Sequence, residues 1–347
     1  MKKQSLGKKV LAGCAVVAMA ATLSACGGSG SNADLVIYSP NSDPLIDNVI
    51  PAFEEETGLK VDIQPGGTGD IITRIDGEKA NPQADIQYGG LAPAQLAQYP
   101  DNYEEYTSKY DAEIPEQYRV YKGVINHYGL DGSAAIIINN EKCEELGVDP
   151  ASIDSYESLL NPKLKGQIAM GNPAKSSSAW AELCNMLLVM GDKPYDQKAW
   201  DWVAKFVDNL DGKILDSSSA IYKGTADGEY AVGVSYEDPC IGMLDDGAEG
   251  ISVIYPKEGA VWLPAGVAVI KGAPHQENAQ KFIDFLLSEK GQACIAKTTN
   301  RPVREGVNNE SKNMKALSEL NVKVEDQQFT ADHKEEWGNK WNELCGQ

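Results

Sequence analysis

The chain has 347 residues, 42% of them hydrophobic, and 31 lysine and arginine residues against 51 acidic ones give a formal net charge of -20. This length and apolar content indicate a folded chain larger than one small domain and exclude disordered, collagen-like and coiled-coil classes. The acidic balance excludes a nucleic-acid binder, because clustered basic side chains hold phosphate backbones. It does not exclude small phosphates, which backbone amides and hydroxyls can bind.

Residues 1–25 predict an export signal. A basic segment precedes an apolar run, 10–23, that is short for a membrane span, and no later run of about 18 apolar residues follows. The tetrapeptide Leu23-Ser24-Ala25-Cys26 resembles a bacterial lipobox, in which cleavage precedes a lipid-bearing cysteine. Residues 26–33 are then a lipid-anchored, glycine- and serine-rich tether. We expect an extracytoplasmic protein that Cys26 anchors to the cell membrane.

Cleavage makes the folded part more acidic. The signal holds four lysines and no acidic residue, so 27 basic side chains remain against 51 acidic ones, a charge of -24. Five of the seven cysteines also lie in this part, and they are scattered, without CxxC or zinc-binding spacing. We interpret them as buried small apolar side chains, and the sequence leaves their pairing open. They are Cys143, Cys184, Cys240, Cys294 and Cys345.

The mature chain begins with alternating strands and helices. Apolar runs predict strands at 34–38, 60–64 and 85–88, and amphipathic segments predict helices that end near Thr57 and Ala80. Each strand ends in a turn rich in glycine or hydroxyl residues. This order is typical of a parallel α/β sheet.

The pattern then restarts, with strands expected at 134–139, 167–170 and 230–236. Helices are expected near 155–160, from Ser176 to 190, at 196–210 and from Asp216 to 228, and later a strand at 263–270 with helices at 276–288 and 290–297. We predict an α/β, two-lobed fold with a ligand cleft between the lobes. Lobe 1 is expected at 34–130 and 260–347, and lobe 2 at 131–259.

Small polar residues at the strand ends form the candidate site. Ligands of open α/β sheets bind beyond the carboxyl ends of the strands, where helix N-termini favour anions. Hydroxyls and glycines let an oxyanion approach the backbone, a carboxylate accepts hydrogen bonds from sugar hydroxyls or pairs with an ammonium, and an arginine can clamp a phosphate. Alternatively, each serine is a helix N-cap and the arginine forms a structural salt bridge. The candidates are Ser39, Asn41, Thr68, Gly69, Gly90, Ser176, Ser177, Ser178, Ser218, Tyr236, Glu237 and Arg301.

Signatures of catalysis are missing from the sequence. It contains no GxSxG elbow, no GxxxxGK[ST] phosphate loop, no HExxH and no GxGxxG after a strand, and its three histidines are isolated from possible metal ligands. We therefore expect no cofactor and no resident metal. With a lipid anchor and two lobes, this favours a receptor that closes on a ligand over an enzyme. A surface phosphoester hydrolase is the alternative from another class.

Several segments of the mature chain resemble the extracellular solute-binding proteins of ABC importers, in the branch that holds ferric-iron binders. They are the segments 36–39, 53–61, 160–166 and 228–233, and they come with the signal and lipobox. The resemblance implies the type II periplasmic-binding-protein fold, no enzymatic activity, and delivery of a captured ligand to membrane permease subunits. We expect a monomer that binds no nucleic acid.

The resemblance also bears on the ligand. Ferric binders usually carry two adjacent tyrosines where this chain has Tyr236 and Glu237, whereas 172–178, 216–224 and 300–304 resemble sugar-phosphate and phosphoglycerate binders. It implies that Ser39, Thr68 and Ser176 to Ser178 hold a phosphate and that Glu237 orients the organic part. Asn41 stands where relatives often have histidine. A small phosphorylated metabolite is the predicted ligand, and ferric iron and aminoethylphosphonate are the alternatives.

Overall fold

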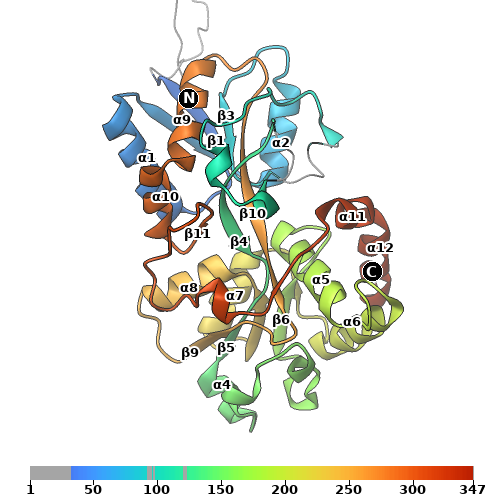
Figure 1. The fold of residues 1–347 in the computed structure, drawn as a ribbon. Coiled ribbons are helices and arrows are strands. Elements are labelled where there is room, and N and C mark those ends of the chain that lie inside the picture. Colours follow the sequence, from blue (N-terminus) through green and yellow to red (C-terminus); the bar gives the residue numbers. More distant parts are fainter. Residues whose placement is uncertain (1–32, 92–95, 97, 120–122, 347) are drawn as a thin grey trace, which may run out of the picture. The chain divides into compact units, whose positions relative to one another are not determined.

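A computed structural model describes residues 33–346, except 92–95, 97 and 120–122 (Figure 1). The predicted export signal and the predicted lipidation site, Cys26, lie outside the described residues. Among the helices that are described, none has the length and apolar character needed to cross a membrane.

The first sheet contains seven described strands in the order β11-β4-β10-β3-β1-β2, with β12 paired to β10. β1 pairs in parallel with β2 and β3, while β10 runs antiparallel to β3 and β4. The carboxyl ends of β1, β2 and β3 therefore meet at one edge, and the strands predicted there are confirmed. The strands are β1 (Leu35–Ser39), β2 (Val61–Pro65), β3 (Ile86–Tyr88), β4 (Asn126–Gly132), β10 (Ala260–Val269), β11 (Arg301–Pro302) and β12 (Val322–Lys323).

Helices cover both faces of this sheet. Figure 1 shows α1, α9 and α10 grouped on one side of it and α2 on the other. The α1 helix buries Phe53, whose ring meets those of Phe282 and Phe285 in α9 at centroid distances of 5.1 and 5.5 Å. It ends at Gly58, where φ is 71° and glycine is favoured. The helices are α1 (Asp43–Thr57), α2 (Thr68–Gly77), α9 (Gln276–Leu287) and α10 (Glu289–Ala296).

The second sheet has the strand order β7-β6-β8-β5-β9. β6 pairs in parallel with β7 and β8, so these three strands also end at one edge, and β5 runs antiparallel to β8 and β9. The strands are β5 (Ala135–Asn139), β6 (Ile168–Gly171), β7 (Ile214–Leu215), β8 (Val232–Ser235) and β9 (Ile251–Ile254). The accompanying helices are α4 (Asn140–Glu145), α5 (Ser177–Val189), α6 (Gln197–Leu210), α7 (Ser218–Ala226) and α8 (Glu237–Asp245).

Short 3-10 helices connect these elements. The helix expected near 155–160 is one of them, because Glu157–Leu160 forms a single 3-10 turn rather than an α-helix. The α8 helix was not expected, since its apolar positions are few. The 3-10 helices are η1 (Asp111–Glu113), η2 (Glu116–Tyr118), η3 (Pro150–Ser152), η4 (Glu157–Leu160), η5 (Pro162–Leu164) and η6 (Leu317–Glu319).

Three chain segments cross between the two sheets, at β4 to β5, at β9 to β10, and after β11. They are hydrogen bonded to one another at one place. The Ser133 amide and hydroxyl donate to the Val261 carbonyl at 2.9 and 3.0 Å, and β12 pairs with β10 at Ala260 and Val261. The Asn321 side chain donates to the carbonyls of Lys257 and Glu258. We call this region the crossing region.

The last two helices, α11 (Gln327–Asp332) and α12 (Lys334–Leu344), lie beside α5 and α6 (Figure 1). The Trp337 ring lies 6.0 Å from that of Trp180 in α5 and 6.3 Å from that of Trp200 in α6. The sequence placed 260–347 together in lobe 1, yet these contacts join the end of the chain to helices of the second sheet. The reason is aromatic packing between residues far apart in the sequence.

The five cysteines of the folded part are free thiols, and four of them are buried. Burial raises the pKa of the Cys143 thiol to about 11. A thiol of high pKa is a poor nucleophile and a poor metal ligand at neutral pH. This agrees with their interpretation as small apolar side chains.

Candidate functional site

The carboxyl edge of the first sheet brings together Ser39 and Asn41. The buried Ser39 hydroxyl donates to the Tyr88 carbonyl at 2.7 Å, and the Asn41 amide donates to the same carbonyl at 3.1 Å. The Tyr128 hydroxyl in turn donates to Asn41 Oδ1 at 3.0 Å. The hydrogen bond of Ser39 therefore orders the loop that follows β1.

Thr68, Gly69 and Gly90 lie at the same edge. Gly90 has φ 68°, and a Cβ atom there would lie 2.5 Å from Thr68 Oγ1, so only glycine allows the two loops to approach this closely. Thr68 and Gly69 open α2, whose N-cap residue, Gly67, has no side chain that could cap the helix. The first turn of α2 also contains Asp70, whose negative charge opposes an anion there.

The carboxyl edge of the second sheet brings together the hydroxyl-rich starts of α5 and α7. Gly171 at the end of β6 pairs with Leu215 at the end of β7, so the loops that follow are adjacent. Lys175 and Asp216, one from each loop, form an ion pair at 2.8 Å. The predicted residues Ser176, Ser177, Ser178 and Ser218 all lie here.

These two helix starts differ from the others at the sheet edges in their charge. The first turns of α5 and α7 contain no acidic residue, whereas those of α1, α2 and α8 contain Asp43, Asp70, and Glu237 with Asp238. Ser176 caps α5 through the Ala179 amide, as the N-cap alternative expects, but Ser217 makes no such bond in α7. The partial positive charge of α5 and α7 is therefore available to an anion.

Tyr236 lies at the end of β8, next to this serine cluster. Burial raises the pKa of its phenol, and contact with Ser218 acts in the opposite direction. The neutral phenol is thus the form present at physiological pH. Among the described residues, no group of three or more His, Cys, Asp and Glu side chains is arranged to hold a metal ion.

Glu237 and Arg301, both predicted as ligand-binding residues, are paired with each other. Arg301 Nε donates to Glu237 Oε2 at 2.8 Å and Nη2 donates to Oε1 at 2.5 Å. Trp262 Nε1 donates to Oε2 at 2.8 Å and the Tyr255 hydroxyl to Oε1 at 2.5 Å. Gly132 makes room for the pair, because a Cβ there would lie 2.7 Å from that of Glu237. The pair joins α8 to β10 and β11.

Two carboxylates next to this pair, Asp131 and Asp238, complete the region, and neither is among the residues predicted to bind the ligand. Asp131, in β4, makes no hydrogen bond or ion pair with another described residue. Its side chain is exposed to solvent, yet desolvation by surrounding protein raises its pKa to about 7, with further contributions from Asp238 and Glu237. Exposure and desolvation coexist where protein flanks a side chain that water still reaches. The segment of β4 has no apolar alternation, so neither this strand nor Asp131 could be predicted from a sequence pattern.

Asp238 contacts the two residues that precede β11, a strand of the first sheet. Its Oδ1 accepts hydrogen bonds from the Thr299 hydroxyl and from Asn300 Nδ2, the latter at 3.2 Å. Burial raises its pKa, and the Thr299 and Ser42 hydroxyls act in the opposite direction. Ser42 comes near enough for this effect without the geometry of a hydrogen bond. Asp131 and Asp238 are thus two neighbouring acceptors.

Replacing Asp131 by asparagine is expected to raise the thermal unfolding midpoint at pH 8 and to leave it unchanged near pH 4. The pKa of this carboxyl is about 7 in the folded protein, above its usual value of 3.8, which we take for the unfolded chain. The contribution of the protonated carboxyl to the free energy of unfolding is therefore fully present below pH 3.8, and it is lost as the pH rises through 7. Unfolding scans from pH 4 to 8 measure the effect. The exposed Glu249→Gln serves as control, and an equal gain in that variant would contradict the assignment.

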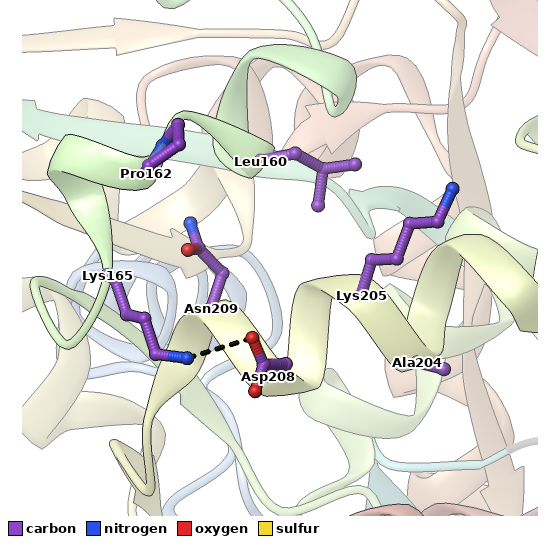
Figure 2. A pocket seen from close by; sticks show the side chains of 7 residues that line it. All are labelled: Leu160, Pro162, Lys165, Ala204, Lys205, Asp208 and Asn209. Atoms are coloured by element: carbon purple, nitrogen blue, oxygen red, sulfur yellow. Dashed lines mark hydrogen bonds and ion pairs between the residues drawn. The ribbon is translucent and has the colours of Figure 1, made fainter.

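The larger of the two described cavities does not coincide with these residues. It has a volume of about 560 Å³, and Figure 2 shows seven side chains that line it, with Lys165 and Asp208 joined by an ion pair at 2.8 Å. They come from α6 and from the 3-10 turns before β6. None of the predicted ligand-binding residues is among them.

Comparison with known proteins assigns the chain to a family. The family model described as bacterial extracellular solute-binding protein matches residues 48–322. The chain belongs to this family. It is 29% identical over 315 residues to iron uptake protein A1 of Synechocystis, covering 84% of both chains. It is 24% identical to a putative 2-aminoethylphosphonate-binding periplasmic protein of Salmonella typhimurium, covering 77% of this chain and 76% of the relative.

A solved structure extends the likeness to most of the chain. The periplasmic binding protein AfuA from Actinobacillus pleuropneumoniae, with fructose-6-phosphate bound, matches with a TM-score of 0.77 and 25% identity, covering 90% of this chain and 98% of that one. The solute-binding protein described here therefore has the two-lobed type II periplasmic-binding-protein fold, as predicted. It is the substrate-binding component of an ABC importer, and its relatives are extracytoplasmic binding proteins rather than enzymes.

Proposed function

We propose that this solute-binding protein is a lipid-anchored receptor, held by Cys26, that captures a small phosphorylated metabolite between its lobes for an ABC permease. A hexose phosphate or a phosphoglycerate is the expected class of ligand. The observation that carries the proposal is the pair of adjacent helix starts at α5 and α7, which combine serine hydroxyls with first turns free of acidic residues. The likeness to a protein solved with fructose-6-phosphate supports it.

The charges of the protein determine where each part of the proposed ligand binds. The phosphate binds at α5 and α7, through backbone amides and the hydroxyls of Ser177 and Ser218, because the first turns of these helices contain no acidic residue and the nearby Asp216 is paired with Lys175. The organic part faces Asp131 and Asp238, which accept hydrogen bonds from its hydroxyls. Glu237 and Arg301 act by holding α8 in place, since each already has its partner.

A phosphonate that carries an ammonium group is the second candidate. Asp131 favours it, because this carboxylate has no cationic partner among the described residues and a bound ammonium would supply one. The likeness to the putative 2-aminoethylphosphonate-binding protein points the same way. Ferric iron has the likeness to iron uptake protein A1 in its favour, but among the described residues no group of three or more His, Cys, Asp and Glu side chains is arranged to hold a metal ion.

The first experiment measures the unfolding midpoint of the purified protein with millimolar hexose phosphates, phosphoglycerate, 2-aminoethylphosphonate, inorganic phosphate and chelated iron. A ligand at about 100 times its dissociation constant adds about 2.7 kcal/mol, which raises the midpoint by several degrees. A shift with a sugar phosphate or phosphoglycerate is the expected result. A shift with 2-aminoethylphosphonate alone would favour the second candidate, and a shift with iron alone would refute both.

Replacing Ser177 by aspartate is expected to abolish binding of the phosphorylated ligand. The new carboxylate stands in the first turn of α5, where it repels a phosphate but suits the helix dipole, so the fold keeps its stability. Calorimetric titration measures the affinity, and the midpoint without ligand reports the fold. Ser152→Asp in η3, also on an exposed serine, is the matched control and retains binding. Undiminished affinity in Ser177→Asp would refute the phosphate position.

A further inference from the structure

Helix α8 is anchored in the lobe of the second sheet. It follows β8, and its buried Cys240 forms an apolar cluster with Ile137 of β5 and Ile251 of β9. Met243 and Leu244 pack against the same cluster. The helix therefore moves with the second sheet when the lobes move.

Residues 298–310 are anchored in the lobe of the first sheet. They include β11, which pairs with β4, and hydrogen bonds tie them to α10. The Val303 amide donates to Gln292 Oε1 at 2.8 Å. The Glu310 amide donates to the Ala296 carbonyl, also at 2.8 Å. This segment therefore moves with the first sheet.

Hydrogen bonds join these two anchored elements at the start of α8. The Glu237 carboxylate accepts from both Nε and Nη2 of Arg301 in the buried pair. Asp238 Oδ1 accepts from the Thr299 hydroxyl and from Asn300 Nδ2, the latter at 3.2 Å. The donors lie in β11 or immediately before it, so the first turn of α8 is bonded to the other lobe.

The same contact continues at the end of α8. Asp245, its last residue, accepts with Oδ1 from the Ser311 hydroxyl at 2.9 Å and from Asn313 Nδ2 at 2.7 Å. The chain beyond them is tied back to β11, because the Lys315 carbonyl accepts from Arg301 Nη2 at 2.7 Å. The helix has nine residues, so the bonds between the lobes extend over about 12 Å.

We propose that α8 and residues 299–313 form a latch that holds the two lobes together. All of its contacts are between protein groups, so the latch does not need a ligand in order to form. A ligand enters between the lobes while the latch is open, and the latch then adds to the free energy that keeps the lobes closed around it. This inference goes beyond the proposed function and does not depend on the identity of the ligand.

Distances between two spin labels, one on each lobe, test the latch. A ketone-bearing amino acid at the exposed positions Glu55 in α1 and Glu144 in α4 carries the labels, so that the native thiols are not modified. Wild-type protein dialysed free of ligand is expected to give one narrow distance. Thr299→Val combined with Asn313→Ala removes a donor at each end of α8, and we expect a second distance to appear. Each lost hydrogen bond raises the ratio of open to closed protein about fivefold.

Thr73→Val combined with Asn48→Ala is the matched control. These two side chains donate to carbonyls of their own helices, α2 and α1, so the wild-type distance is expected to remain. An equal change in both double variants would overturn the proposal. So would an unchanged distance in Thr299→Val with Asn313→Ala, or two comparable populations in the wild type.

Gly242 provides a second test that removes no hydrogen bond. It lies midway along α8, and a Cβ atom there would lie 3.9 Å from Thr299 Oγ1, an ordinary contact. Gly242→Ala therefore fits, whereas Gly242→Phe places a ring against the other lobe. Both residues favour a helix more than glycine does, so neither variant weakens α8. We expect the wild-type distance in Gly242→Ala and a second distance in Gly242→Phe, and identical distances in the two variants would contradict the latch.

Discussion

Replacing Arg301 by methionine is expected to lower the free energy of unfolding by about 3–5 kcal/mol, the usual cost of breaking a buried ion pair. Arg301 and Glu237 are 5% and 1% exposed, and the guanidinium holds both oxygens of the carboxylate. Removing the arginine leaves a buried charge that the hydrogen bonds from Trp262 and Tyr255 do not neutralise. The midpoint of urea unfolding measures the loss.

A double variant separates the lost pair from the uncompensated charge. Arg301→Met combined with Glu237→Leu removes both charges and fills the space with apolar atoms, so we expect it to be more stable than Arg301→Met alone. Arg301→Lys keeps the charge without the bidentate geometry and is expected to lie between wild type and Arg301→Met. If the double variant were less stable than Arg301→Met, the buried charge would not be the cause.

Replacing Trp337 by alanine is expected to cost about 3–5 kcal/mol, as for other buried tryptophans that lose their packing. The side chain is 4% exposed. Its ring lies 5.2 Å from that of Tyr195 and within 6.3 Å of those of Trp180 and Trp200, so it holds α12 against α5 and α6. Thermal unfolding and hydrogen exchange of the α12 amides measure the global and the local effect.

Phe329→Ala is the matched control for this variant. Phe329 belongs to the same aromatic cluster, with its ring 6.0 Å from that of Trp337, but it is 38% exposed. It loses less contact with protein on truncation, and we expect a cost below that of Trp337→Ala. Equal costs for the two variants would show that burial against α5 and α6 is not what stabilises α12.

The sequence predicted the parallel part of the fold well, because apolar runs between glycine-rich turns mark β1, β2 and β3. It missed β4, whose sequence, residues 126–132, mixes polar residues with two glycines and is buried by its neighbours β10 and β11 rather than by its own pattern. It also missed α12, which carries two buried tryptophans among polar residues. Tertiary contacts override local preference in both segments.

The same limit applies to the candidate site. Parallel pairing brings the serines at 176–178 together with Ser218. The sequence alone indicated this proximity, because both groups of serines follow the carboxyl ends of predicted strands. The partnership of Glu237 with Arg301, 64 positions apart, requires the fold. Asp131 was not predicted because it lies in β4, a strand that the sequence pattern does not indicate. Its unpaired carboxylate is nevertheless available to accept hydrogen bonds from a ligand.

The crossing region has a consequence for motion. Two crossing strands alone allow two lobes both to bend and to twist against each other. Here the other two crossing segments are each hydrogen bonded to the segment between β9 and β10, because Ser133 binds the Val261 carbonyl and β12 pairs with β10. We therefore expect the lobes to move mainly by rotation about this place rather than by twist. A permease that contacts both lobes can read the angle between them as occupancy of the receptor.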